Sequence, residues 1–248
     1  MNGYPLSKSF LLAALFIKEQ LKEPVALFWM VVSPAVTFYL IAYARTSNDD
    51  RTISYLAVTS WFYAFIACSV AFFGLAFYIV GRRESGFLRS FVYTTPTKLI
   101  FLFGQFFAYS ILSIVYCVVF YGLTKFYFGP GVEVLDVLDI VLRFYICFIL
   151  FSIFSLLLTL VPLSFQNAST VFSVLLCLML ALGIVSVSSS HTALQLIKIL
   201  NPMGWANQIM VEGVAESIDI VLVVMAAFSI SFGVTFRLLL INPVWSRY

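Results

Sequence analysis

The sequence predicts an all-α membrane protein with six transmembrane helices, and three observations support this. Hydrophobic residues make up 62% of the 248 residues and charged residues 10%. Soluble domains have about 45–50% apolar residues and about 25% charged residues. The mean hydropathy is +1.06. The apolar residues gather in runs of about 20, the length that a helix needs to cross a bilayer. Because six such runs with short loops occupy the chain, we expect one transmembrane domain over residues 1–248 and no separate soluble domain.

The first segment, residues 7–23, differs from the runs that follow. Its apolar side chains gather on one side of a helix, and Lys18, Glu19, Lys22 and Glu23 add charge to the last turns. A helix of this kind lies in the membrane interface rather than crossing the bilayer. Its apolar part is short and has polar flanks, which does not fit a cleaved signal peptide, so we expect the mature chain to begin at its first residue.

The first two spans follow directly. Pro24 ends the interface helix, and residues 25–44 form the first span, kinked where Ser33 and Pro34 interrupt it. The second span, residues 54–80, is long and rich in aromatic residues. Its side chains are candidates for the wall of a hydrophobic substrate path, although packing against lipid explains the same residues equally well. The candidate path residues are Trp61, Phe62, Phe65, Ser69, Phe72 and Phe73.

Four further spans complete the domain: residues 99–121, 137–161, 170–187 and 218–241. At the start of the fourth span, Asp139 and Arg143 are spaced for an i, i+4 ion pair. Residues 188–217, between the last two spans, are too polar to cross a bilayer. We interpret them as an outer segment of two short, re-entrant-like helices that dip into the interface and break at Asn201 and Pro202.

The distribution of positive charge predicts the orientation of the chain. With both termini in the cytoplasm, nine Lys and Arg residues lie on the inner side and five on the outer side, in agreement with the positive-inside rule. The inner set is Lys8, Lys18, Lys22, Arg82, Arg83, Arg89, Lys98, Arg237 and Arg247. The loop after the second span, residues 82–95, therefore faces the cytoplasm.

This cytoplasmic loop is the most charged stretch of the chain. Glu84, Phe87, Leu88 and Phe91 follow the i, i+3, i+4, i+7 spacing of one helical face, and we expect Pro96 to end the helix. A short amphipathic helix between two spans has the shape of a contact point for another protein. The alternative is a loop whose arginines only set the topology, and the residues alone favour neither.

Two motifs, together with the order of the spans, carry a family resemblance. Residues 82–89 read Arg-Arg-Glu-Ser-Gly-Phe-Leu-Arg, with Pro96 downstream, and Leu200-Asn201-Pro202 precedes the last span. With the interface helix and the six spans, this layout resembles the membrane subunit of an ABC-2 type exporter over essentially the whole chain. The resemblance implies a pair of such subunits, most simply a homodimer, held by two cytoplasmic ABC ATPase subunits that bind ATP and Mg²⁺.

The resemblance also implies which residues transmit the work of the ATPases. A coupling helix over residues 82–95 would contact the partner, flanked by the interface helix. We expect its arginines to pair with acidic groups of the ATPase, and Phe87 and Leu88 to fill an apolar groove. The implied ATPase-coupling residues are Arg82, Arg83, Glu84, Gly86, Phe87, Leu88, Arg89 and Phe91, with Lys18 and Lys22 of the interface helix.

The sequence offers no energy source or cofactor site of its own. Gly81 and Gly86 have the spacing of the glycines in a phosphate-binding loop, but Phe87 and Leu88 occupy the positions that need Lys and Ser or Thr. His191 is the single histidine, and the four cysteines lie in apolar runs without metal-ligand spacing. We therefore expect no metal site and no catalytic residue. The middle of each span lacks an acid, which argues against a proton-coupled transporter.

These observations predict the permease subunit of an ATP-driven exporter in the cytoplasmic (inner) membrane, moving an amphipathic or hydrophobic solute such as a drug, a lipid-like molecule or a peptide. The expected partners are two ATPase subunits, a second permease copy and membrane lipids, and no nucleic acid. Three alternatives stay open. They are export of a lipid-linked polysaccharide, an intramembrane lipid-modifying enzyme that uses Asp136 and Asp139, and an immunity or scaffold protein that needs no ATPase.

Overall fold

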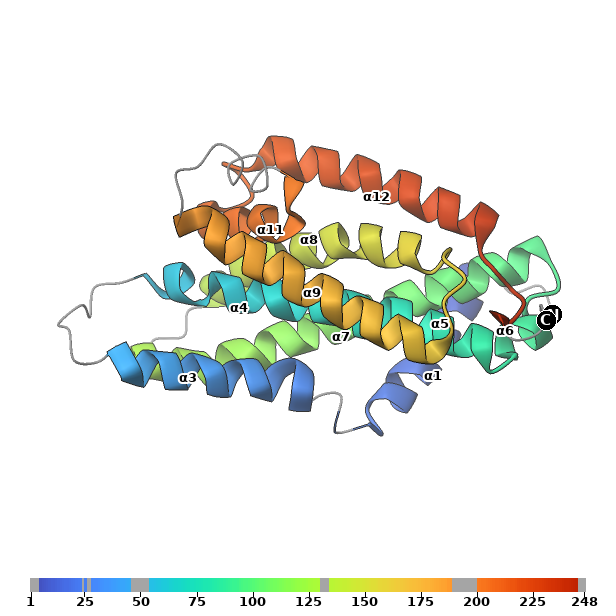
Figure 1. Ribbon diagram of the computed structural model, residues 1–248, viewed down its shortest axis with the longest axis horizontal. Coiled ribbons are helices and arrows are strands. Elements are labelled where there is room, and N and C mark those ends of the chain that lie inside the picture. The colour runs from blue at the N-terminus through green and yellow to red at the C-terminus, as the bar shows by residue number, and fades with distance from the viewer. Residues whose placement is uncertain are drawn as a thin grey trace.

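Membrane-length helices dominate the architecture. The computed structural model describes residues 5–23, 25, 28–45, 54–129, 134–188 and 200–244. Within these ranges every regular element is a helix, and the long helices lie side by side in one elongated bundle (Figure 1). Five helical stretches are long and apolar enough to cross a membrane: Tyr55–Glu84, Thr95–Phe128, Val134–Leu158, Phe165–Ser186 and Ile218–Leu238. The prediction of an all-α, multi-pass membrane protein is thereby confirmed.

The first predicted span, residues 25–44, is not among these five because its helix is shorter. Its apolar helical part covers Phe28–Ala44 and consists of a π-helix, η1 (Phe28–Val32), followed by α3 (Ser33–Arg45). Pro34 lies just after the π-helix, and because it has no N–H, one helical hydrogen bond is missing at this junction. The count of six spans therefore stays a prediction.

The N-terminal helix α1 (Pro5–Gln20) packs along α7 (Thr95–Lys125). The Tyr109 hydroxyl of α7 donates to the buried Gln20 Oε1 at 2.9 Å, which fixes the last turn of α1. Predicted over residues 7–23, the helix ends at Gln20 and continues as a turn. Its position in the membrane interface stays a prediction.

The second span is the most buried of the five membrane-length stretches. It is one continuous stretch made of α4 (Tyr55–Ser69), the π-helix η2 (Val70–Ala76) and α5 (Phe77–Glu84). The sequence-based boundary at residue 80 is too early. The helix continues for another turn because the side chain of Arg83 finds hydrogen-bond partners inside the fold.

The π-helix η2 lies where the second span approaches α7 most closely. A Cβ added to Gly74 would stand 2.5 Å from two carbons of the Tyr109 ring, so this contact requires glycine. Ser155 donates its hydroxyl proton to the Ala71 carbonyl at 2.6 Å. A π-turn disturbs the regular pairing of helical carbonyls, and the serine supplies a partner for one of them.

A capping box begins α7. The Thr94 hydroxyl accepts from the Thr97 N–H, and the Thr97 hydroxyl accepts from the Thr94 N–H at 3.1 Å. Pro96 lies in this first turn, where proline is favoured. It therefore starts α7 instead of ending the preceding helix, α6 (Phe87–Phe91), which has already stopped.

The remaining helices are arranged around α8 (Val134–Leu158). It contacts η2, α7, α11 (Pro202–Glu212) and α12 (Ile218–Leu238). The helix α9 (Phe165–Ser188) lies across the front of the view in Figure 1. Few residues of α9 and α12 are buried, so both helices present long apolar faces to the outside of the chain.

Part of the predicted outer segment, residues 188–217, is helical as α11. Asn201 caps this helix with its side-chain oxygen, and its amide nitrogen donates to the Met179 carbonyl of α9 at 2.7 Å. The asparagine before the proline thus joins two helices. Residues 189–199, which include His191, lie outside the described residues.

The predicted i, i+4 ion pair at the start of α8 is confirmed. Arg143 Nη2 lies 2.6 Å from Asp139 Oδ2. Arg143 Nη1 also donates to the Met210 carbonyl at 3.0 Å, which ties the last turn of α11 to α8. Arg143 therefore stabilises the packing of α11 against α8 at this end of the bundle.

Candidate functional site

The predicted coupling helix, residues 82–95, is divided by a tight turn. Arg82, Arg83 and Glu84 belong to the last turn of α5, and a separate five-residue helix, α6, follows. Gly86 lies between the two with φ of 78°, a left-handed conformation that glycine adopts without steric cost. We call the segment from Arg82 to the end of α6 the charged turn.

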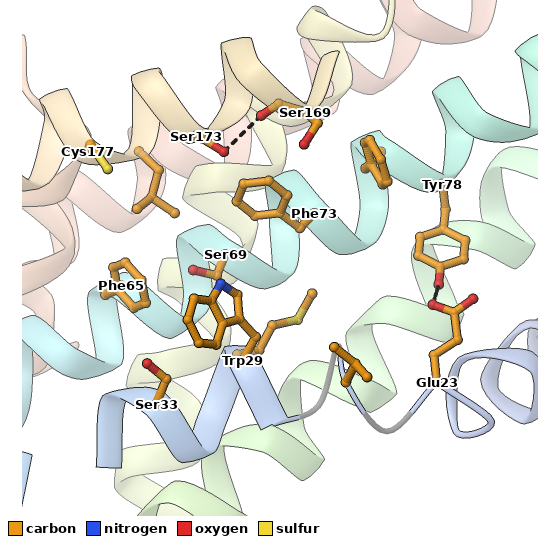
Figure 2. Close-up of a pocket in the computed structure, with 14 residues that line it drawn as sticks. Glu23, Trp29, Ser33, Phe65, Ser69, Phe73, Tyr78, Ser169, Ser173 and Cys177 are labelled. Atoms are coloured by element: carbon orange, nitrogen blue, oxygen red, sulfur yellow. Dashed lines mark hydrogen bonds between the residues drawn. The ribbon is translucent and has the colours of Figure 1, made fainter. Parts of the chain in front are cut away.

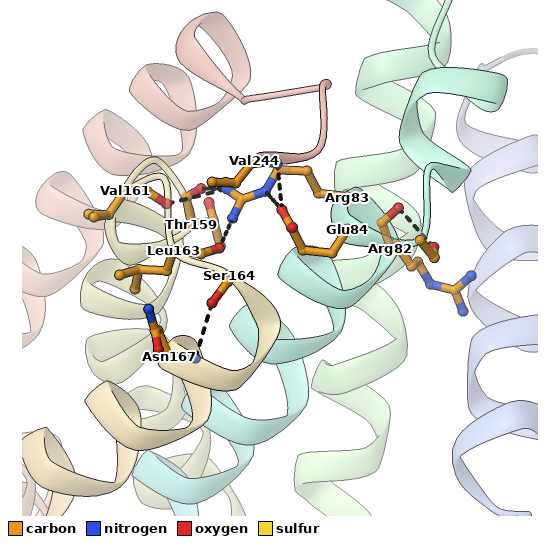
Figure 3. A network of polar contacts seen from close by, with 10 residues as sticks. Arg82, Arg83, Glu84, Thr159, Val161, Leu163, Ser164, Asn167 and Val244 are labelled. Carbon is orange, nitrogen blue, oxygen red and sulfur yellow. Dashed lines mark hydrogen bonds and ion pairs between the residues drawn. The ribbon is translucent and has the colours of Figure 1, made fainter. Parts of the chain in front are cut away.

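Arg82 joins the charged turn to α1. Its guanidinium pairs with the Glu19 carboxylate of α1. It also lies over two rings, with its Cζ 4.1 Å from the Phe16 centroid and 5.1 Å from the Phe87 centroid. The helix α1 and the charged turn are thus in direct contact. Figure 3 shows Arg82 directed away from its neighbour Arg83.

Arg83 has an internal role, in contrast to the expectation that it pairs with a partner protein. Its side chain is 2% exposed and lies 3.0 Å from Glu84 Oε1. Its guanidinium donates to three carbonyls in the turn between α8 and α9, those of Thr159 at 3.1 Å, Val161 at 3.3 Å, and Leu163. Figure 3 shows the guanidinium inserted into this turn. A group held in this way is not available to an ATPase in this conformation.

Glu84 completes the same network. Its Oε1 accepts from the backbone N–H of Val244 at 3.1 Å, and this bond holds the C-terminal segment against the end of the second span. The pair of Arg83 and Glu84 therefore joins the second span, the α8–α9 turn and the C-terminal segment at one point (Figure 3).

The apolar residues of the charged turn mostly face inward. Leu88 is fully buried in the core, so it anchors α6 rather than filling a groove on a partner. Phe87 and Phe91 are half-buried and stack with their ring centroids 5.4 Å apart. Arg89 and Ser90 are exposed. Lys18 of α1 and Lys22 in the turn that follows it are exposed too, as are the acidic Glu19 and Glu23.

A cavity of about 890 Å³ lies against the second span, between η1 and α3 on one side and α9 on the other. Figure 2 shows aromatic rings and serine hydroxyls from these three walls directed into it. The lining residues from the N-terminal half are Glu23, Val25, Trp29, Met30, Ser33, Phe65, Ser69, Phe73, Phe77 and Tyr78. Those from α9 are Ser169, Ser173, Leu176 and Cys177.

Three of the six predicted path residues line this cavity, namely Phe65, Ser69 and Phe73. The other three do not contribute to its wall. Phe72 is buried against Phe172, with ring centroids 5.8 Å apart. Phe62 stacks on Phe120 at 6.2 Å.

The third, Trp61, packs against α9 rather than lining the cavity. A Cβ added to Gly183 would meet the Trp61 ring at 2.8 Å, so glycine is needed where α4 and α9 touch. The aromatic residues of the second span therefore divide between packing and cavity lining.

A second, smaller cavity of about 300 Å³ adjoins the first. Both are lined by Glu23, Phe77 and Tyr78, and the smaller one extends to Arg82 and Ser85. The lining of the large cavity thus leads to the charged turn. Phe77 and Tyr78 belong to α5, so one rigid helix carries both features.

A comparison with known proteins finds a relative that matches almost the full chain. The protein is 31% identical over 240 residues to Protein McbE of Escherichia coli, covering 95% of this chain and 97% of the relative. The chain belongs to the McbE family. No family model matches it. The name McbE states neither an activity nor a substrate, so a function has to be argued from the site itself.

Several residues that matter in this McbE-family chain were not singled out from the sequence as site residues. Glu23 and Trp29 come from a part of the chain whose helix boundaries the apolar pattern placed differently. Ser169, Ser173 and Cys177 had a usable signal, since they recur every four residues on one side of an otherwise apolar helix.

The residues that the structure describes do not include a cluster of side chains that could hold a metal ion. No group of three or more His, Cys, Asp or Glu side chains lies close enough together there to hold an ion. Asp136 lies in the first turn of α8, and Asp139 is paired with Arg143.

Proposed function

We propose that this chain is the permease subunit of an ATP-driven ABC exporter, which moves an amphipathic or hydrophobic solute outward across the cytoplasmic membrane. The solute would be a drug, a lipid-like molecule or a peptide. The observation that carries the proposal is that one helix, α5, connects the charged turn to the wall of a large apolar cavity. A force applied at the turn is therefore applied to the cavity.

The contacts of the charged turn support such a transmission. Arg82 links it to α1, and Arg83 links it to the α8–α9 turn from which α9 begins. Because α9 forms the opposite wall of the cavity, movement of α5 relative to the rest is communicated to two walls at once. A hinge or shear movement of packed helices of this kind is a common route to alternating access.

The energy would come from two separate ATPase subunits that bind ATP and Mg²⁺ in the cytoplasm. The residues proposed to contact them are the exposed Lys18, Lys22 and Arg89, with the half-buried Phe87 and Phe91 beside them. Arg83 and Leu88 are removed from this set because they are buried within this chain. Exposed cations at the contact would attract an acidic partner surface and raise the association rate.

A second copy of the chain would complete the transporter. The faces of α9 and α12 are apolar and little buried within this chain, so they are available to lipid or to another subunit. Lys98 donates to the Arg237 carbonyl at 3.1 Å, so two residues of the predicted inner set lie at one end of the bundle. This supports a topology with both termini in the cytoplasm.

Co-purification tests the proposal. A tagged chain extracted in mild detergent should retain an ATP-binding protein, identified by mass spectrometry, and the complex should hydrolyse ATP.

Arg89→Glu should lower the hydrolysis and the recovery of the ATPase about tenfold, since it reverses an exposed charge at the contact. Lys125→Glu is the matched control, because Lys125 lies beside Tyr55 at the far end of the second span. A chain that purifies alone, without ATPase activity, would contradict the proposal and favour an immunity or scaffold protein.

The alternatives have less support from the site. An intramembrane enzyme using Asp136 and Asp139 would need both carboxylates free, but Asp139 is held by Arg143 at 2.6 Å. Export of a lipid-linked polysaccharide would be indicated if loss of the gene removed a surface glycan.

A further inference from the structure

Charge is distributed unevenly over the large cavity. Its walls consist mainly of rings and aliphatic side chains, with serine hydroxyls between them. One carboxylate, that of Glu23, stands beside Tyr78 at one end of the cavity, as Figure 2 shows. Glu23 is the one charged residue in the lining and also lines the smaller cavity. A solute passing between the two cavities would meet this group.

Glu23 differs from Glu19 in its polar partners. Its nearest acidic neighbour in the smaller cavity, Glu19, is neutralised by Arg82. Glu23 instead accepts a hydrogen bond from the Tyr78 hydroxyl. Among the described residues, no Lys or Arg forms an ion pair with Glu23. The Tyr78 bond orients the carboxylate and does not neutralise it.

The aromatic residues close to Glu23 are suited to the same kind of ligand. Phe77 and Tyr78 belong to the turn of α5 beside it, and Trp29, farther along the cavity beside Ser69, offers an aromatic surface to the rest of a bound molecule (Figure 2). Trp29 is 71% exposed, so its face is open to a bound molecule. A carboxylate and open aromatic faces together favour an organic cation, whereas an anion would be repelled by Glu23.

We propose that the cavity binds amphipathic solutes that carry a positive charge, with the cationic group at Glu23 and Tyr78 and the apolar body against Trp29, Phe65 and Phe73. The volume of about 890 Å³ is at the upper end of the range for small-molecule sites, about 300–1,000 Å³. The inference rests on the proposed function, because it names the chemical class of the exported solute.

A pair of probe ions separates charge from shape. Tetraphenylphosphonium and tetraphenylborate have nearly the same size and apolar surface but opposite charge. Binding of each labelled ion would be measured by equilibrium dialysis to the full chain in phosphatidylcholine nanodiscs, and binding to empty nanodiscs would be subtracted. We expect saturable binding of the phosphonium ion. The absence of such binding to the unmodified chain would overturn the proposal without any variant.

Three variants then test whether Glu23 causes the preference for the phosphonium ion over the borate ion. Glu23→Gln keeps an acceptor for Tyr78 but removes the charge, and should weaken phosphonium binding about tenfold while leaving or raising borate binding. Glu23→Lys should reverse the preference. Tyr78→Phe removes the hydrogen bond that orients the carboxylate but retains the charge, so it should weaken phosphonium binding less than Glu23→Gln does. Equal effects of Glu23→Gln on both ions, or no effect, would refute the proposal. Since no ATPase is present, failure here is distinct from failure to recover an ATPase partner.

Discussion

At the scale of single residues, two neighbouring arginines with the same sequence context have different roles. Arg82 remains near the surface and pairs with Glu19, whereas Arg83 is buried and donates to backbone carbonyls. The helical repeat places consecutive residues about 100° apart, so one arginine points towards α1 and the other into the α8–α9 turn. The sequence predicts a cationic segment here, but which cation is internal depends on a turn some 80 residues later.

Replacement of Arg83 should therefore destabilise the protein rather than only weaken a partner contact. Arg83→Leu would remove the ion pair with the partly buried Glu84 and the hydrogen bonds to three carbonyls, at an expected cost of about 3–5 kcal/mol. Thermal unfolding in detergent, followed by loss of monodisperse protein, measures this effect. Arg89→Leu is the control and should have almost no effect, because Arg89 is exposed. Equal stability of the two variants would show that the Arg83 network does not stabilise the fold.

At the scale of elements, the apolar runs predict that the helices exist but not where they end. The second span and α7 both extend beyond their apolar runs, to Glu84 and from Thr95. A helix can continue through polar residues when other parts of the fold accept their hydrogen bonds, as they do for Arg83. A helix can also begin among polar residues when one of them caps it, as Thr94 does. The sequence was compatible with this start, since proline is favoured in the first turn of a helix as well as after its end.

The π-helix in the second span gives a prediction at this scale. Gly74→Ala would place a methyl group against the Tyr109 ring, where a Cβ has only 2.5 Å, and overpacking of this kind costs about 1–3 kcal/mol. We expect a lower unfolding temperature and partial recovery in the double variant with Tyr109→Leu. Gly122→Ala, in α7 with no atom within 4 Å of the added Cβ, should be neutral or stabilising by up to about 1 kcal/mol. Equal unfolding temperatures of Gly74→Ala and Gly122→Ala would contradict a close contact between the backbone at Gly74 and the Tyr109 ring.

At the scale of the whole molecule, the candidate site is the part that the sequence predicts least completely. Half of the predicted path residues line the cavity, namely Phe65, Ser69 and Phe73. These three recur every four residues along the second span, a pattern that can be read from the local sequence. The facing walls come from η1, α3 and α9, and no local pattern indicates that these meet. Glu23 illustrates the difference, since it was expected only as a charge at the end of an interface helix and lies instead at the mouth of a cavity.

The orientation of the bundle decides whether the charged turn can meet a cytoplasmic ATPase. Ser90 is exposed at the charged turn, and Phe126 is 82% exposed at the other end of the second span, where Phe128 packs against Tyr55 with centroids 5.1 Å apart. The 30-residue stretch between these ends is about 45 Å long, enough to cross a bilayer. The two positions should therefore lie on opposite sides of the membrane.

Cysteine labelling measures this directly. In a chain whose four native cysteines are replaced, Ser90→Cys should react with a membrane-impermeant maleimide only after the cells are permeabilised, because we expect the charged turn to be cytoplasmic. Phe126→Cys should react in intact cells, and each variant is the control for the other. The reverse pattern would put the charged turn outside and remove the basis for ATPase coupling, whereas Glu23 would still present its carboxylate to the cavity. Labelling of both in intact cells would show that the second span does not cross the membrane.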